Sequence, residues 1–146
     1  MSEEWKHAGW VSWLGKLAWI FILINGIVGI IWSIVNIAQI AAWNASLGPL
    51  YQIPYPFRLF WYLVWSIVVI ILALVIIRPK FSKPCGEKDW ETLYGWYLKL
   101  GSLKVPWMFI WGLIFTFFSW YAWGGVFILI PAIMLIWFGP RKYDWK

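Results

Sequence analysis

The chain has 146 residues, of which 63% are hydrophobic, 23% aromatic and only 12% charged, with a net charge of +6. A soluble globular domain carries about 25% charged residues and about half apolar ones, so this composition excludes an ordinary water-soluble domain. Intrinsic disorder is excluded too, because it requires low hydrophobicity and high charge. The class that remains is an integral membrane protein.

Charge-free stretches of the sequence predict where helices cross the membrane. Residues 17–57, 59–77 and 105–140 contain no Asp, Glu, Lys or Arg, and a membrane-spanning helix needs about 20 mostly apolar residues. The first stretch ends in a proline-rich loop, and Gly124-Gly125 is expected to form a turn that divides the third. We therefore expect four spans, at about 17–43, 59–77, 105–123 and 126–138, with a loop at 78–104.

The last predicted span is short for a full crossing. Two interpretations stay open at this point. The bilayer thins locally so that residues 126–138 cross it, or residues 105–138 form a re-entrant hairpin that is buried in protein.

Basic residues predict the orientation of these spans. Of the 12 Lys and Arg residues, only Arg58 lies between the first two spans, and none lies between the last two. Cytoplasmic segments are enriched in Lys and Arg, so we expect a multi-pass protein of the cell membrane with both termini and the 78–104 loop in the cytoplasm. The expected fold class is an all-α integral membrane protein whose four transmembrane helices form two hairpins. The positive charge then needs no nucleic-acid partner.

The 78–104 loop is expected to contain an interfacial amphipathic helix. Asp89 is a suitable N-cap, and Trp90, Leu93, Tyr94 and Tyr97 follow with helical spacing. The alternatives are a helix that docks on a partner and an irregular loop. A second interfacial segment is expected before the first span, around Trp5, Trp10 and Trp13.

Ionisable residues inside a span are candidates for function by default, but the predicted spans contain none. All six acidic residues and the single histidine, His7, lie outside them. The single cysteine, Cys85, excludes an intrachain disulfide and a cysteine metal cluster. It is expected to be a free thiol, with acylation as the alternative. We therefore expect no enzyme activity, no catalytic or metal-binding residues, and no cofactor.

Uncharged polar and small residues are the remaining candidates within the spans. Those of the first span fall mainly on one helix face, and the third span has a matching small face. Such faces serve helix packing, and the alternative is a polar pore or substrate path. The residues are Asn25, Gly29, Ser33, Asn36 and Gln39 in the first span, and Gly112, Thr116 and Ser119 in the third.

Basic residues after the second span are candidates for contact with anionic lipid headgroups. They are Arg78, Lys80, Lys83 and Lys88. The alternative is that they act only as a topology signal. Trp19 and Trp32 lie deeper in the first span and pack against lipid, a quinone or neighbouring helices.

The function expected from these features is non-catalytic. We expect a structural or accessory subunit of a larger membrane complex or homo-oligomer, whose partners are membrane lipids and other membrane subunits or copies of itself. A small oligomeric channel or carrier is the first alternative. A lipid- or quinone-binding accessory protein that uses Trp19 and Trp32 is the second.

Overall fold

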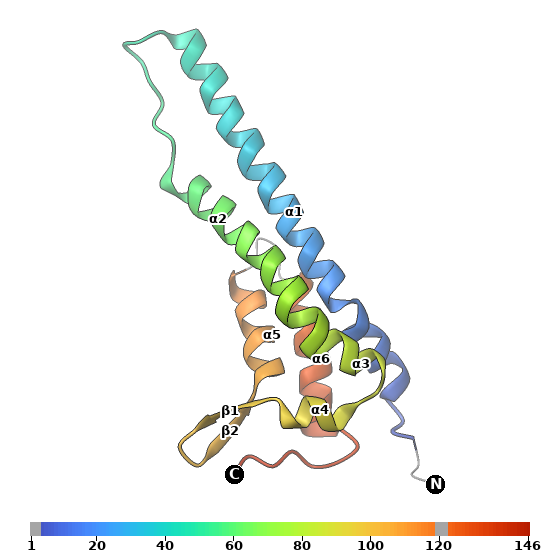
Figure 1. The fold of residues 1–146 in the computed structure, drawn as a ribbon. Helices are drawn as coiled ribbons and strands as arrows, with labels where there is room; N and C mark the ends of the chain where they lie inside the picture. The colour runs from blue at the N-terminus through green and yellow to red at the C-terminus, as the bar shows by residue number, and fades with distance from the viewer. Residues whose placement is uncertain (1–3, 119–122) are drawn as a thin grey trace.

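The computed structural model describes residues 4–118 and 123–146, which are mostly helical (Figure 1). The main helices are α1 (Ala8–Leu47), α2 (Phe57–Leu72), α5 (Trp107–Phe118) and α6 (Trp123–Phe138). A π-helical segment, η1 (Ala73–Ser82), and a short α3 (Lys83–Gly86) continue α2. The connection to α5 contains α4 (Trp90–Gly95), β1 (Tyr97–Leu100) and β2 (Leu103–Pro106).

Two of these helices are long and apolar enough to cross a membrane. They are Ala8–Leu47 and the continuous helix Phe57–Gly86, which pack against each other. Only 28% and 22% of their most apolar segments are buried inside the chain. Their apolar side chains therefore face outward, whereas the core helix of a soluble protein would bury them.

The shorter helices α5 and α6 cover only part of this long pair. They pack against each other, and α6 also packs along α1. Figure 1 shows them beside the half of α1 that lies nearer the two chain ends, so the other ends of α1 and α2 project beyond them. The indole Nε1 of Trp65 in α2 donates a hydrogen bond of 2.5 Å to the carbonyl oxygen of Phe118 at the end of α5.

Two expected helix boundaries are wrong. The helix that starts with α2 does not stop at Arg78-Pro79 but continues through Pro79 to Gly86, because the wider π-helical turn accommodates the proline ring. Gly124-Gly125 is not a turn but part of α6, where both glycines are buried. A Cβ on Gly125 would overlap the backbone of α5. The expected end of the third span, including Ser119, falls on residues outside the described ones.

The expected helix in the 78–104 loop is only partly correct. Asp89 is the N-cap and accepts a hydrogen bond from Thr92 N at 3.2 Å, but the helix ends at Gly95. Tyr97 instead begins an antiparallel β-hairpin, with Gly101 in the left-handed conformation at its turn. The third span, expected from residue 105, consequently starts as α5 at Trp107. At the N-terminus, Trp10 and Trp13 belong to the first turns of α1 rather than to a separate segment.

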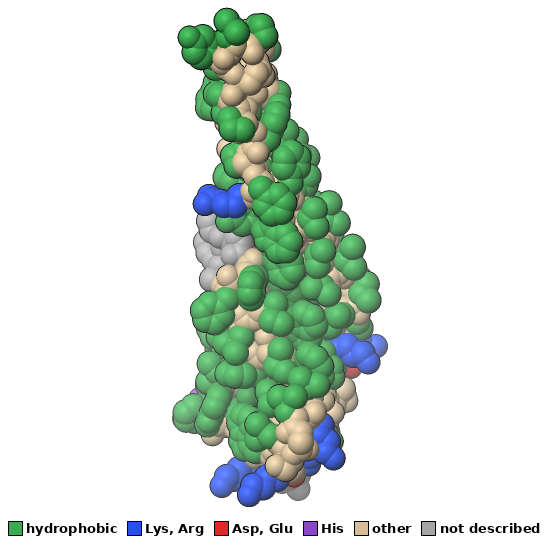
Figure 2. Space-filling view, turned by 90° about the vertical axis from the view of Figure 1, so that its left-hand side faces the viewer, with side chains coloured by type: hydrophobic (Ala, Val, Ile, Leu, Met, Phe, Trp, Pro, Cys, Tyr) green, Lys and Arg blue, Asp and Glu red, His purple; other side chains and the backbone are tan. Residues whose placement is uncertain are grey.

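Polar contacts concentrate at the end of the molecule that carries both termini. Ion pairs join Lys88 to Glu4, Lys104 to Asp144 and Arg141 to Glu91. Figure 2 shows Lys and Arg side chains gathered mainly at this end, below a largely hydrophobic face. This end is therefore the polar base of the molecule.

Tyr94 ties α4 to the end of α6. Its hydroxyl donates a hydrogen bond of 2.8 Å to Leu135 O, which lies in the last turn of α6. Burial raises the pKa of Tyr94 to about 12. The hydroxyl therefore keeps its proton, and this bond, at neutral pH.

The burial of Cys85 gives the first prediction. Its Sγ is fully buried and lies 3.5 Å from Val11 O, next to Gly15 in α1. We expect Cys85 in the folded protein to react at least tenfold more slowly with a polar maleimide than a cysteine introduced at the exposed Ser102. After denaturation in SDS both should react alike. Equal labelling of the two in the folded protein would contradict the packing of α3 on α1.

Candidate functional site

Small residues bring α1 and α2 into close contact along one strip, which we call the small-residue seam: Gly26 and Gly29 of α1 and Ser66 of α2. A Cβ on Gly26 would lie 3.0 Å from Ser66 O, and one on Gly29 would overlap Ser66 Oγ. Glycine is thus required here because the two helices leave no room for a side chain. Close approach through Gly and Ser is the usual basis of helix association in membranes.

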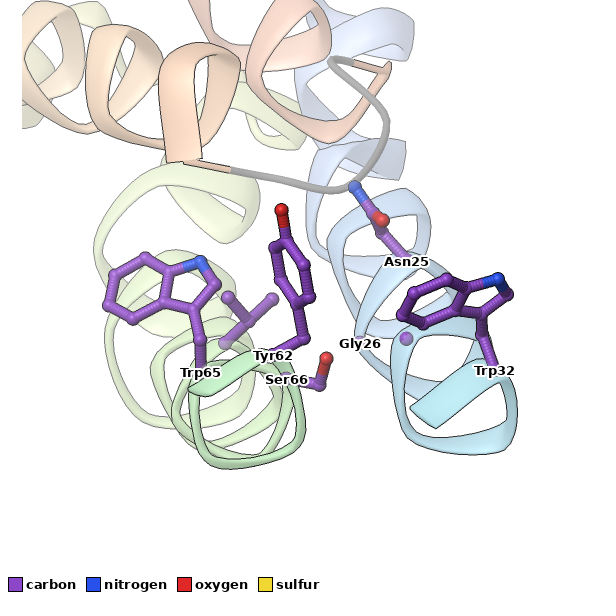
Figure 3. A pocket seen from close by; sticks show the side chains of 8 residues that line it. Asn25, Gly26, Trp32, Tyr62, Trp65 and Ser66 are labelled. Atoms are coloured by element: carbon purple, nitrogen blue, oxygen red, sulfur yellow. The ribbon is translucent and has the colours of Figure 1, made fainter. Parts of the chain in front are cut away.

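A small cavity lies beside the small-residue seam (Figure 3). Its volume is about 10 Å³, and the rings of Trp32 from α1 and of Tyr62 and Trp65 from α2 surround it together with Asn25. The Trp32 and Tyr62 rings meet edge to face at 5.9 Å. A cavity of this size holds about one water molecule and is too small for a solute path through a single chain.

The residues of the predicted polar face of α1 do not share one environment. Asn25, Gly29 and Ser33 are buried, whereas Asn36 is half-buried and Gln39 is exposed. Asn36 donates its amide to Trp32 O of its own helix at 2.8 Å. The face is divided because the C-terminal turns of α1 extend beyond the first residue of α2. The last polar residue of this face of α1, Gln39, therefore has no helix opposite it.

Gly112 and Thr116 belong to a different contact, between α5 and α6. A Cβ on Gly112 would lie 3.0 Å from the Leu129 Cα, and the Thr116 hydroxyl donates to Gly112 O at 2.7 Å. The two predicted small faces therefore meet different partner helices and do not line one common path. Ser119, the third member, lies outside the described residues.

The far end of α1, the linker after it and the first residue of α2 form an apolar surface. We define this apolar arm by its exposed side chains: Trp43, Leu47, Leu50, Tyr51 and Phe57, whose exposures are 55%, 48%, 88%, 73% and 80%.

Hydrogen bonds of the Asn44 side chain give the apolar arm a defined structure. Its Nδ2 donates to Ile53 O at 2.9 Å, and its Oδ1 accepts from Ile53 N at 2.6 Å. The linker is thereby held against the last turns of α1. The sequence predicted only a loop here, because a bond between residues nine positions apart leaves no local signal.

The four predicted anionic-lipid contacts have different environments as well. Arg78 and Lys83 line one groove, which also contains Lys16. Lys80 is exposed but does not line it, and Lys88 pairs with Glu4. Sequence reasoning missed Lys16, because it lies more than 60 residues from Arg78 in the chain and only the packing of α1 on η1 brings them together.

The described part of the chain gathers no cluster of metal-binding side chains. Among residues 4–118 and 123–146, no group of three or more His, Cys, Asp or Glu side chains is placed to hold a metal ion. No protein-family model, no curated protein and no solved structure matches the chain.

The small-residue seam gives the second prediction. Gly29→Leu should force α1 and α2 apart and destabilise the folded chain by about 1–3 kcal/mol, the usual cost of overpacking a well-packed contact. Thermal unfolding in detergent micelles measures this. Gln39→Leu, on the exposed part of the same predicted face, is the matched control and should leave the melting temperature within about 1 °C. Equal effects of the two substitutions would show that Gly29 and Gln39 share one environment after all.

Proposed function

We propose that the chain is a non-catalytic, multi-pass membrane protein that serves as a structural or accessory subunit of a larger membrane complex or homo-oligomer. Three features support the proposal: two long helices with outward apolar surfaces, the distribution of basic residues, and the apolar arm.

The helix that begins with α2 matches the thickness of a bilayer. Arg58 and Arg78 bracket the uncharged residues Leu59 to Ile77, a length of about 28 Å at 1.5 Å per residue. The hydrocarbon core of a bilayer is about 30 Å thick. Because the basic residues other than Arg58 belong to the polar base and the segments joined to it, the positive-inside rule favours a cytoplasmic location for both termini.

The α5–α6 hairpin reaches less far than this helix. α5 has 12 residues and α6 has 16, lengths of about 18 and 24 Å. The hydrogen bond from Trp65 Nε1 satisfies the Phe118 carbonyl oxygen, as is required where a helix ends within the hydrocarbon region. This contact, together with the packing of α6 on α1, favours a re-entrant hairpin over two full additional crossings, and it leaves the cytoplasmic location of the termini unchanged.

The apolar arm is the observation that carries the subunit proposal. Trp32 of α1 packs on Tyr62 of α2. The two helices are antiparallel, so moving one turn from this contact leads to Asn36 on α1 and to Arg58 on α2. Asn36 and Arg58 therefore lie at the same level. From Ile37 to Leu47, α1 then continues for about 16 Å beyond the level of Arg58.

Water is a poor environment for that part of α1. No charged residue occurs between Leu17 and Phe57, and the side chains of the apolar arm are largely exposed in the single chain. Exposed apolar patches of this kind mark interaction sites. A partner subunit or a second copy that covered them would gain about 25 cal/mol for each Å² of apolar surface removed from water.

An assembly experiment tests this proposal. The complex extracted from its source membrane in mild detergent is analysed by native mass spectrometry, with the wild-type chain and with the triple variant Leu50→Ala, Tyr51→Ala and Phe57→Ala. We expect the wild type to retain other polypeptides or further copies at fixed stoichiometry. The variant should bind them about 100-fold more weakly, since interface anchors each contribute more than about 1 kcal/mol.

The control removes three exposed apolar side chains from the shaft of the long helices. Ile31, Val64 and Val75 are 57%, 55% and 64% exposed, and their joint replacement by Ala should leave the assembly intact. Recovery of the wild-type chain only as a monomer with bound lipid would contradict the proposed function.

A further inference from the structure

An open groove of about 520 Å³ lies where α1 meets η1 and α3. Lys16 and Trp19 line it from α1, and Arg78, Ser82 and Lys83 line it from the other helix, with Leu74 on its apolar side. We call it the basic groove. Three cationic side chains from three different elements thus converge on one space, and no acidic residue lines it in the described part of the chain.

Packing positions these cations. The Arg78 guanidinium lies 4.9 Å from the centre of the Trp19 ring, a cation–π contact that orients it. The aliphatic stem of Lys16 packs on Gly86, where an added Cβ would lie 3.1 Å from Lys16 Cγ. Gly86 is itself held to α1, because its carbonyl oxygen accepts a hydrogen bond of 3.1 Å from the Ser12 hydroxyl. The basic groove is therefore built by the same helix contacts that build the fold.

Some basic residues of the polar base have an acidic partner, and the three cations of the basic groove do not. Lys88, Lys104 and Arg141 each form an ion pair. Lys16, Arg78 and Lys83 form none with the described residues. Like charges that are held together repel one another, so an anion in the basic groove would relieve this repulsion and gain charge-assisted hydrogen bonds, for which the Arg78 guanidinium matches phosphate geometry.

The other wall of the basic groove indicates what the anion is attached to. Leu74 is 42% exposed and leads from the cations onto the outward apolar surface of the long helix pair, where Val75 and Ile71 are exposed as well. A ligand that fills this space has a phosphate at one end and a hydrocarbon chain at the other.

We propose that the basic groove binds the phosphate headgroup of one anionic phospholipid of the cytoplasmic leaflet, with an acyl chain lying along Leu74. This inference rests on the membrane orientation of the proposed function but not on any partner subunit. It changes the set of lipid contacts expected from the sequence: Arg78 and Lys83 stay, Lys16 joins them, and Lys80 and Lys88 are excluded.

The test uses the purified full chain in nanodiscs that contain phosphatidylglycerol and phosphatidylcholine. Native mass spectrometry counts the lipids that remain bound after release. We expect one phosphatidylglycerol to be retained in preference to phosphatidylcholine. The variant Lys16→Gln, Arg78→Gln and Lys83→Gln should lower its occupancy at least tenfold. The control Lys80→Gln, Lys88→Gln and Lys142→Gln removes the same charge and should change the occupancy less than twofold.

Further readouts keep the outcomes distinct. An unchanged melting temperature and unchanged protection of Cys85 would show that the groove variant is folded. If it is not, the single variant Arg78→Gln takes its place, with an expected loss of at least threefold.

Soluble glycerol phosphate at millimolar concentration should not displace the lipid. Displacement would overturn the acyl-chain contact by showing that phosphate alone is recognised. Equal loss of lipid in groove and control variants would overturn the proposal in favour of general surface charge. Because no partner is present, lipid binding and subunit assembly can each fail without the other.

Discussion

The close contact of Gly29 with Ser66 fixes the register of α1 against α2, and the other features of the molecule depend on that register. An added Cβ on Gly29 would overlap Ser66 Oγ, so the helices can approach this closely only at small residues. Ile70, one turn further along α2, packs directly on Gly26, where an added Cβ would lie 2.5 Å from its Cγ1. The position of each helix along the other is therefore determined by the small residues at which the two helices meet.

Both ends of the long helix pair follow from this register. At one end it leaves the last turns of α1 without an opposing helix, which produces the apolar arm. At the other end it brings Trp19 beneath the Arg78 guanidinium and Lys16 next to Gly86. The subunit proposal and the lipid proposal concern sites at opposite ends of the chain, yet one contact in the middle sets the geometry of both.

The sequence was informative where a local property decides the outcome. Long uncharged stretches identified the apolar helices, and Asp89 identified the start of α4. The sequence misled where packing overrides local preference. Pro79 does not end its helix because η1 widens around it, and Gly124 with Gly125 permits close helix contact instead of making a turn. The β-hairpin after Gly95 had a usable signal in Gly101-Ser102 between two short apolar segments.

The candidate site residues were harder to interpret than the helices. A helical face can be read from spacing alone, but the neighbour of that face cannot. Asn25 and Gln39 are on the same predicted face, yet one is buried and the other exposed, because α2 covers only part of α1. Lys16 and Arg78 show the converse, since residues far apart in the chain share one groove only after the helices pack.

The depth of α1 in a bilayer decides whether the apolar arm needs a partner. Single spin labels at Ile31, Leu47 and Leu50, placed one at a time in a Cys85→Ser background in nanodiscs, report whether oxygen or a water-soluble nickel chelate reaches each position. We expect the label at Ile31 to lie in the hydrocarbon core and to be reached mainly by oxygen, whereas labels at Leu47 and Leu50 should lie beyond the headgroups and be reached mainly by the chelate. Hydrocarbon depth at all three positions would contradict this expectation, because the apolar arm would then be covered by lipid and would need no partner.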